Sequence, residues 1–250
     1  MTRRVCSTGL PILLYRGRPC IQVAISVDEL YGLETGGDPG LAVERANSVE
    51  GSLRVRLDRA RFDGSVWAAS FDNFIFGGLT GRTCSEDHVC VAGDSEELKE
   101  LFYDQRGATF WGMEGQVTLD LYDTGAGLLQ GRLLGDYVRA KLHNAGNVPR
   151  IPPYHLGIGL TWEGDRLASG VLLKYTGSQD KIGAGETPTK GFVSLDAHVA
   201  CHPLASYPGL EVALVGHNLS NTVQRNAVAL NKDEVILQGR NASLTVNMLF

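Results

Sequence analysis

The sequence predicts an all-β fold of antiparallel, up-and-down transmembrane β-barrel strands, about nine or ten of them, forming a partial barrel. Three observations predict this fold. From about Ala46 onward, apolar residues recur at every second position. The connections between these alternating segments are short and long in turn, and the last alternating segment runs out to an aromatic residue, Phe250.

The composition is that of a folded chain rich in turns. It is 43% hydrophobic and 20% charged. The 31 glycines are about 12% of the 250 residues, against an average near 7%, and they are scattered through apolar stretches. Mean hydropathy is -0.06, and no stretch approaches the ~18 consecutive apolar residues of a membrane-spanning helix, which excludes a helical membrane protein. A net charge of -5 without a basic cluster gives no support to nucleic-acid binding.

Nine segments are expected to form strands with one apolar and one polar face. In chain order they are 45–57, 64–76, 109–121, 127–139, 153–162, 166–176, 190–201, 209–219 and 241–250. The apolar faces of the four clearest segments are Met113, Val117, Leu119 and Leu121; Leu129, Leu133 and Tyr137; Leu156, Ile158, Leu160 and Trp162; and Val193, Leu195, Ala197 and Val199.

The connections between these segments fall into two classes. The short ones are 58–63, 122–126, 163–165 and 202–208, and the long ones are 77–108, 140–152, 177–189 and 220–240. In an up-and-down meander all the long connections then emerge at one end of the sheet and all the tight turns at the other. Outer-membrane barrels have this arrangement, with short periplasmic turns and long extracellular loops.

Strand length and aromatic placement favour a membrane barrel over a soluble one. The expected strands run about 10–14 residues, longer than the ~5–6 usual in soluble sheets and suited to a tilted membrane crossing. Trp162 and Phe250 fall at the short-turn end, and Tyr137 and Tyr175 fall at the long-loop end. These four residues are expected to form the interfacial girdles of a barrel embedded in outer-membrane lipid.

The last segment has a recognisable pattern of its own. Leu244, Val246, Met248 and Phe250 alternate with polar residues up to a terminal aromatic. This ending resembles the C-terminal strand signature by which the barrel-assembly machinery of the bacterial outer membrane recognises its clients. We therefore expect that machinery to be a partner, through Phe250.

Several stretches, in one order along the chain, resemble a known family. They are DELYGLETGGDPGLAVERANSVEGSLRVRL, FDNFIF, LFYDQRGATFWGMEGQVTLDL, PRIPPYHLGIGLTW, GAGETPTKGFVSLDAHV and VALVGHNLSNTVQRNAVALNKDEVILQGRNASLTVNMLF. Together they resemble the C-terminal part of the β-barrel of TonB-dependent outer-membrane receptors, over residues 28–250. The YDQRGATFWGME and ETPTKG stretches are similar to the branch that takes up zinc and other metals.

The resemblance implies a transport function and a longer parent protein. A full-length receptor of this kind imports a metal chelate, siderophore or similar small ligand with energy delivered by TonB, and needs no cofactor. The family also carries a plug domain, a TonB-contacting segment and about 22 strands, which this sequence does not show. A fragment of a receptor is therefore expected, with residues 1–27 as a separate N-terminal segment in which 10–27 can supply one further strand.

Two alternatives stay open at this point. One is a self-contained outer-membrane barrel of 8–10 strands, of the enzyme or adhesin type, in which 10–27 supplies the tenth strand and the strand ending at Phe250 pairs with it. The other is a soluble β-sandwich.

Candidate ligand-binding residues gather in the connection 77–108. Cys84, Asp87, His88 and Cys90 offer thiolate, imidazole and carboxylate groups, and the C-x3-H-x-C spacing is compatible with capture of a divalent metal at an extracellular loop. A Cys84–Cys90 disulfide is the alternative. No resident metal site is assigned. No GxSxG elbow or P-loop is found, so the chain is not expected to be an enzyme.

Overall fold

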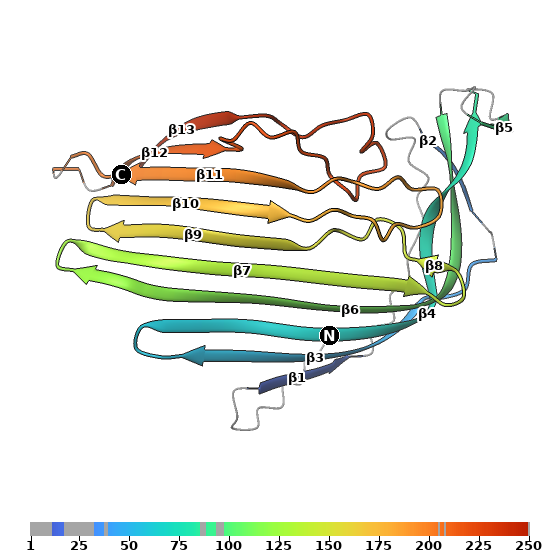
Figure 1. Cartoon of the computed structure of the whole chain (residues 1–250), viewed down its shortest axis with the longest axis horizontal. Helices are drawn as coiled ribbons and strands as arrows, with labels where there is room; N and C mark the ends of the chain where they lie inside the picture. The colour runs from blue at the N-terminus through green and yellow to red at the C-terminus, as the bar shows by residue number, and fades with distance from the viewer. Residues whose placement is uncertain are drawn as a thin grey trace.

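The computed structural model describes residues 12–17, 33–37, 40–85, 89–93, 98–204, 206–207 and 209–249. These residues form one sheet of 13 strands, of which ten follow a continuous path (Figure 1). The path is β1 (Ile12–Gly17), β3 (Arg45–Arg56), β4 (Ala60–Cys84), β6 (Leu98–Thr124), β7 (Gly127–Leu142), β9 (His155–Gly164), β10 (Leu167–Thr176), β11 (Phe192–Cys201), β12 (Leu210–His217) and β13 (Asn241–Met248). Off this path lie β2 (Leu33–Gly37), β5 (Cys90–Ala92) and β8 (Gly146–Asn147).

Neighbouring strands on the path are antiparallel throughout. Figure 1 shows the tight turns gathered at one end of the sheet and the long connections at the other. The predicted fold class, a partial barrel of up-and-down antiparallel strands, is therefore confirmed. Strand β1 lies inside the segment 10–27 and pairs with β3.

Two predicted connections are wrong in their bounds: 58–63 is shorter, because β4 begins at Ala60, and 77–108 differs most. Most of 77–108 is strand, because β4 continues to Cys84 and β6 already begins at Leu98. The two ends pair across Gly77↔Tyr103 and Leu79↔Leu101. We call residues 77–84 and 98–103 the arm. The ladder hydrogen bonds that form it need no alternating side chains, so a Gly-rich, polar stretch can extend a strand without a period-two signal.

The arm turns away from the rest of the sheet. The β4–β6 register shifts between Phe71 and Phe74 and again between Leu79 and Thr83. Such irregularities bend a strand and increase its twist. In Figure 1 the arm consequently rises beside the long connections of the C-terminal strands.

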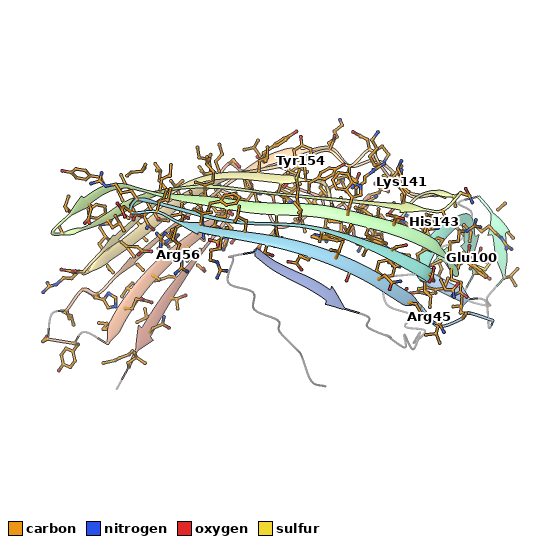
Figure 2. All side chains as sticks on the ribbon, turned by 90° about the horizontal axis from the view of Figure 1, so that it is seen from below. Arg45, Arg56, Glu100, Lys141, His143 and Tyr154 are labelled. Atoms are coloured by element: carbon orange, nitrogen blue, oxygen red, sulfur yellow. A yellow bond between two sulfur atoms is a disulfide. The ribbon has the colours of Figure 1, made fainter. Side chains whose placement is uncertain are left out.

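The sheet has two chemically different faces. The register places Leu133 of β7 opposite Ile158 of β9, and Ile158 opposite Leu173 of β10, so large apolar side chains form rows across strands. Their exposed fractions of 44–56% place them on a surface, and side chains one position along each strand point to the other face. Figure 2 shows the sheet arched, with Tyr154 on the convex side and Arg56 on the concave side. The convex face is therefore the apolar one.

Buried hydrophobic residues are few in the described part of the chain and lie toward the long-loop end. Ala108, Ala140, Leu142 and Val148 form the core cluster. Four phenylalanines of β4 and β6 pack against it, and the Phe71 and Phe110 ring centroids lie 5.0 Å apart. No helix in the described part of the chain is long and apolar enough to span a membrane.

The sheet is open. Within the described residues no pairing joins β1 to β13, so both outer strands keep a free edge. Backbone groups on a free edge are costly in lipid, where no water can satisfy them.

Candidate functional site

A row of polar residues crosses five strands on the concave face. The register places Ser52 of β3 opposite Ser65 of β4, Ser65 opposite Glu114 of β6, Glu114 opposite Asp136 of β7, and Asp136 opposite His155 of β9. Each residue comes from a strand with period-two alternation, so all five side chains emerge on the same side. Only the register brings them into one line.

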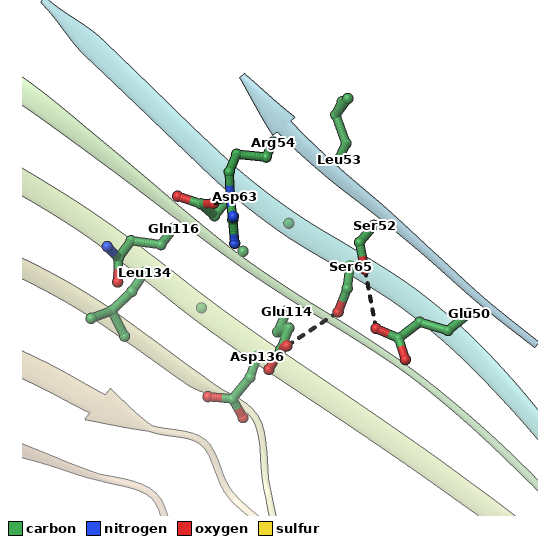
Figure 3. A pocket seen from close by; sticks show the side chains of 13 residues that line it. Glu50, Ser52, Leu53, Arg54, Asp63, Ser65, Glu114, Gln116, Leu134 and Asp136 are labelled. Carbon is green, nitrogen blue, oxygen red and sulfur yellow. Dashed lines mark hydrogen bonds and ion pairs between the residues drawn. The ribbon is translucent and has the colours of Figure 1, made fainter. Parts of the chain in front are cut away.

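Hydrogen bonds link members of this row. The Ser65 hydroxyl donates to the Glu114 carboxylate at 3.1 Å, as Figure 3 shows. His155 Nδ1 lies 2.9 Å from Asp136 Oδ2. The His155 and Asp136 side chains are 29% and 45% exposed, so water reaches both.

A hollow of about 750 Å³ opens over the N-terminal part of this row (Figure 3). One cation and four carboxylates line it, and the cation, Arg54, is paired with Asp63. The four carboxylates belong to Glu50, Asp63, Glu114 and Asp136. The three that are not paired with Arg54 leave a negative surface, which attracts cations from solution.

The predicted loop candidates are only partly described. Cys84 and Cys90 form a disulfide between paired strands β4 and β5, with Cα atoms 3.9 Å apart. Glu100 lies within 4.8 Å of both sulfurs. Sulfurs joined in this way are not thiolates and bind metal poorly. Asp87 and His88 lie outside the described residues, so ligand capture by this loop stays a prediction.

Of the predicted girdle residues, Trp162 and Tyr175 lie near the ends of β9 and β10, whereas Tyr137 lies inside β7, which continues to Leu142. The Trp162 ring lies against Gly127 at the short-turn end of β7 and β9. Tyr137 contacts Trp111 of β6, with ring centroids 5.1 Å apart. Tyr175 meets Tyr154 edge-on at 5.8 Å. Their role at a membrane interface stays a prediction, and Phe250 lies outside the described residues.

Sequence reasoning did not single out Trp111 and Tyr154, whose rings contact the predicted girdle residues Tyr137 and Tyr175. Period-two alternation could have identified both, because Trp111 is in step with Met113 on β6 and Tyr154 is in step with Leu156 and Ile158 on β9. A hydrogen bond with Tyr175 raises the pKa of Tyr154 above its ordinary value of 10.0, with burial adding to the shift. The Tyr154 hydroxyl is therefore neutral at physiological pH.

Comparison with known proteins identifies a matching family model. The model described as "TonB dependent receptor-like, beta-barrel" matches residues 18–219. Among solved structures, the copper transporter OprC superposes with a TM-score of 0.74 at 17% identity over 98% of this chain. The FrpB iron transporter from Neisseria meningitidis, in its apoprotein form, gives 0.65 at 16% identity over 95%. The siderophore receptor PirA from Acinetobacter baumannii gives 0.58 at 14% identity over 84%.

This chain is much shorter than those structures. It covers 38% of the OprC chain, 36% of the FrpB chain and 32% of the PirA chain. At these identities the likeness shows the fold, an arc of the same kind of barrel wall.

Proposed function

Because this chain belongs to the TonB-dependent receptor β-barrel family, we propose that it forms one wall of a receptor that imports a metal ion or metal chelate. Family membership places it in the bacterial outer membrane among transport receptors, which are not enzymes. The observation that carries the proposal is the family match over residues 18–219, which contain nearly all of a two-faced sheet.

The two faces support this role. A convex face of exposed Leu, Ile and Val side chains suits contact with lipid, where charged side chains are costly. A concave face with Glu114, Asp136 and His155 suits a water-filled interior. In a complete receptor the concave face would then border the path of a ligand.

Further partners belong to the same proposal. The free edges of β1 and β13 fit a larger barrel in which other strands pair with them, together with a plug that TonB engages. The alternation of Leu244, Val246 and Met248 on β13 supports recognition by the barrel-assembly machinery. A self-contained small barrel would instead need β1 to pair with β13, and the sheet path offers no support for that pairing.

The import proposal is tested in cells. The coding region of the chain is deleted in its own organism, with a complemented strain as control, and the transition-metal content is measured by mass spectrometry after growth in metal-limited medium. We expect a several-fold fall in at least one transition metal, which complementation restores. The same fall should follow from deletion of TonB. Equal contents of all transition metals in the deleted and complemented strains would contradict the proposal.

A further inference from the structure

A small pocket lies between the arm and three long connections. It has a volume of about 230 Å³ and is lined by the arm and by residues 149–150, 185–187 and 229–233. The Lys99 ammonium of the arm lies 2.7 Å from the Glu234 carboxylate. This ion pair joins the arm to the connection 218–240 at one side of the pocket. Pockets for whole organic ligands are usually ~300–1,000 Å³, so this one suits a smaller group.

Lys232 lines this pocket and is 95% buried, with an exposed fraction of 5%. Its Nζ atom is buried and has no hydrogen-bond partner among the residues that the structure describes. Its backbone carbonyl accepts a hydrogen bond from the Arg225 guanidinium. A buried ammonium without an acceptor is strongly unfavourable, so an acceptor from outside the chain is expected at this point.

The acidic residues around the pocket already have other partners. Glu186 accepts hydrogen bonds from the backbone amides of Arg150, at 3.0 Å, and Gly183, at 2.7 Å. Asp233 accepts one from the Thr187 hydroxyl at 2.6 Å. The third acid, Glu100, accepts a hydrogen bond from the Thr80 hydroxyl and forms an ion pair with Arg82. Both partners belong to the arm. None of the three forms an ion pair with Lys232, although Glu186 and Asp233 keep their negative charge because their hydrogen-bond donors are neutral.

Arg150 also lines this pocket and, unlike the lining residues Arg82 and Lys99, has no ion-pair partner among the described residues. Arg150 follows β8 with a φ of 58°, a left-handed conformation uncommon outside glycine, Asn and Asp. Its backbone amide is bound by Glu186, but its guanidinium makes no hydrogen bond or ion pair with any described residue. Lys232 and Arg150 are therefore two cations without an ion-pair partner among the described residues, in a pocket that Glu186 and Asp233 also line.

We propose that this pocket binds a phosphate group, with Lys232 as a direct ligand and Arg150 as the second cation. Phosphate oxygens accept charge-assisted hydrogen bonds from both side-chain types, which would give the buried Lys232 ammonium the acceptor that it lacks. The group is either a free phosphate or the phosphate of a lipid headgroup at the loop end of the barrel. The site goes beyond the import proposal and does not depend on which ligand is imported.

The test measures binding of inorganic phosphate to the chain folded in detergent micelles, by calorimetry at constant ionic strength. We compare wild type with Lys232→Met, Arg150→Gln and the matched control Lys190→Met, which removes an exposed lysine outside the pocket. We expect saturable binding to wild type and Lys190→Met, at least a tenfold loss for Lys232→Met and a smaller loss for Arg150→Gln. A parallel titration with micelles containing diphosphorylated lipid A identifies the source of the group.

Thermal unfolding separates binding from folding. We expect phosphate or the phosphorylated lipid to raise the Tm of wild type and leave that of Lys232→Met unchanged. Without either, Lys232→Met should match or exceed wild type, because the variant lacks the unpaired buried ammonium. Binding of lipid A alone assigns the site to a headgroup, and binding of free phosphate assigns it to the anion. No saturable binding of either probe to wild type, or equal binding to Lys232→Met, overturns the proposal.

Discussion

The Lys99 ammonium lies 2.7 Å from the Glu234 carboxylate across a sequence separation of 135 residues. This ion pair ties the arm to the connection between β12 and β13. Its side chains are 40% and 63% exposed, so water screens the attraction. The contact therefore positions the arm more than it stabilises the fold.

A double-mutant cycle on Lys99→Met and Glu234→Gln tests this view. We expect a coupling free energy of about 0.2–1 kcal/mol, the range of exposed ion pairs, from urea unfolding in micelles. Limited proteolysis should cut the connection 218–240 faster in either single variant. A coupling well above 1 kcal/mol would show that the pair is shielded from solvent.

Gly185 is predicted to be essential for the contact between the arm and the connection 177–191. Its φ is 77°, and a Cβ atom there would clash with the carbonyl oxygen of Leu79 in the arm. Gly185→Ala should cost more than the ~1–2 kcal/mol of left-handed strain alone. Gly146→Ala is the matched control, because Gly146 has a φ of 87° but open space around its Cβ position. Equal losses in urea unfolding would refute the clash.

The Cys84–Cys90 disulfide closes a short loop, with a sequence separation of 6. Replacing both cysteines by serine should destabilise the arm by about 2 kcal/mol, the chain-entropy estimate for so small a loop. Hydrogen exchange of the arm amides measures the effect, and Cys201→Ser, which removes a free cysteine, is the control. Unchanged protection of the arm would show that the strand pairing holds it without the disulfide.

Leu133 and Leu134 are consecutive on β7 and face opposite sides. Leu133 is 50% exposed on the convex face, whereas Leu134 lines the concave hollow. In lipid vesicles Leu133→Arg should lower the free energy of unfolding by about 2–4 kcal/mol, the cost of a cation near the bilayer midplane. Leu134→Arg should change it by about 1 kcal/mol or less, because water and Asp136 can pair with it. The reverse order would place the wrong face in lipid.

Much of the sheet follows from the sequence because its signal is local. Alternation of Val193, Leu195, Ala197 and Val199 predicts the strand 190–201 and its apolar face, and the structure has β11 at Phe192–Cys201. The sequence did not predict the arm, because the signal for the arm is not local. Its residues 77–84 have no alternation, and they are strand because they pair with β6.

The sequence by itself determined a two-faced antiparallel sheet, its tight-turn and long-loop ends, and the family resemblance. Period-two alternation is visible in neighbouring residues, so it can be found without knowing which residues are in contact. Only the tertiary structure decided which polar residues share a row, such as Ser65 and Glu114, since cross-strand register depends on partners far along the chain. It alone placed Lys232 and Arg150 in one pocket, because the arm and three separate loops build that pocket and none of them carries a periodic signal.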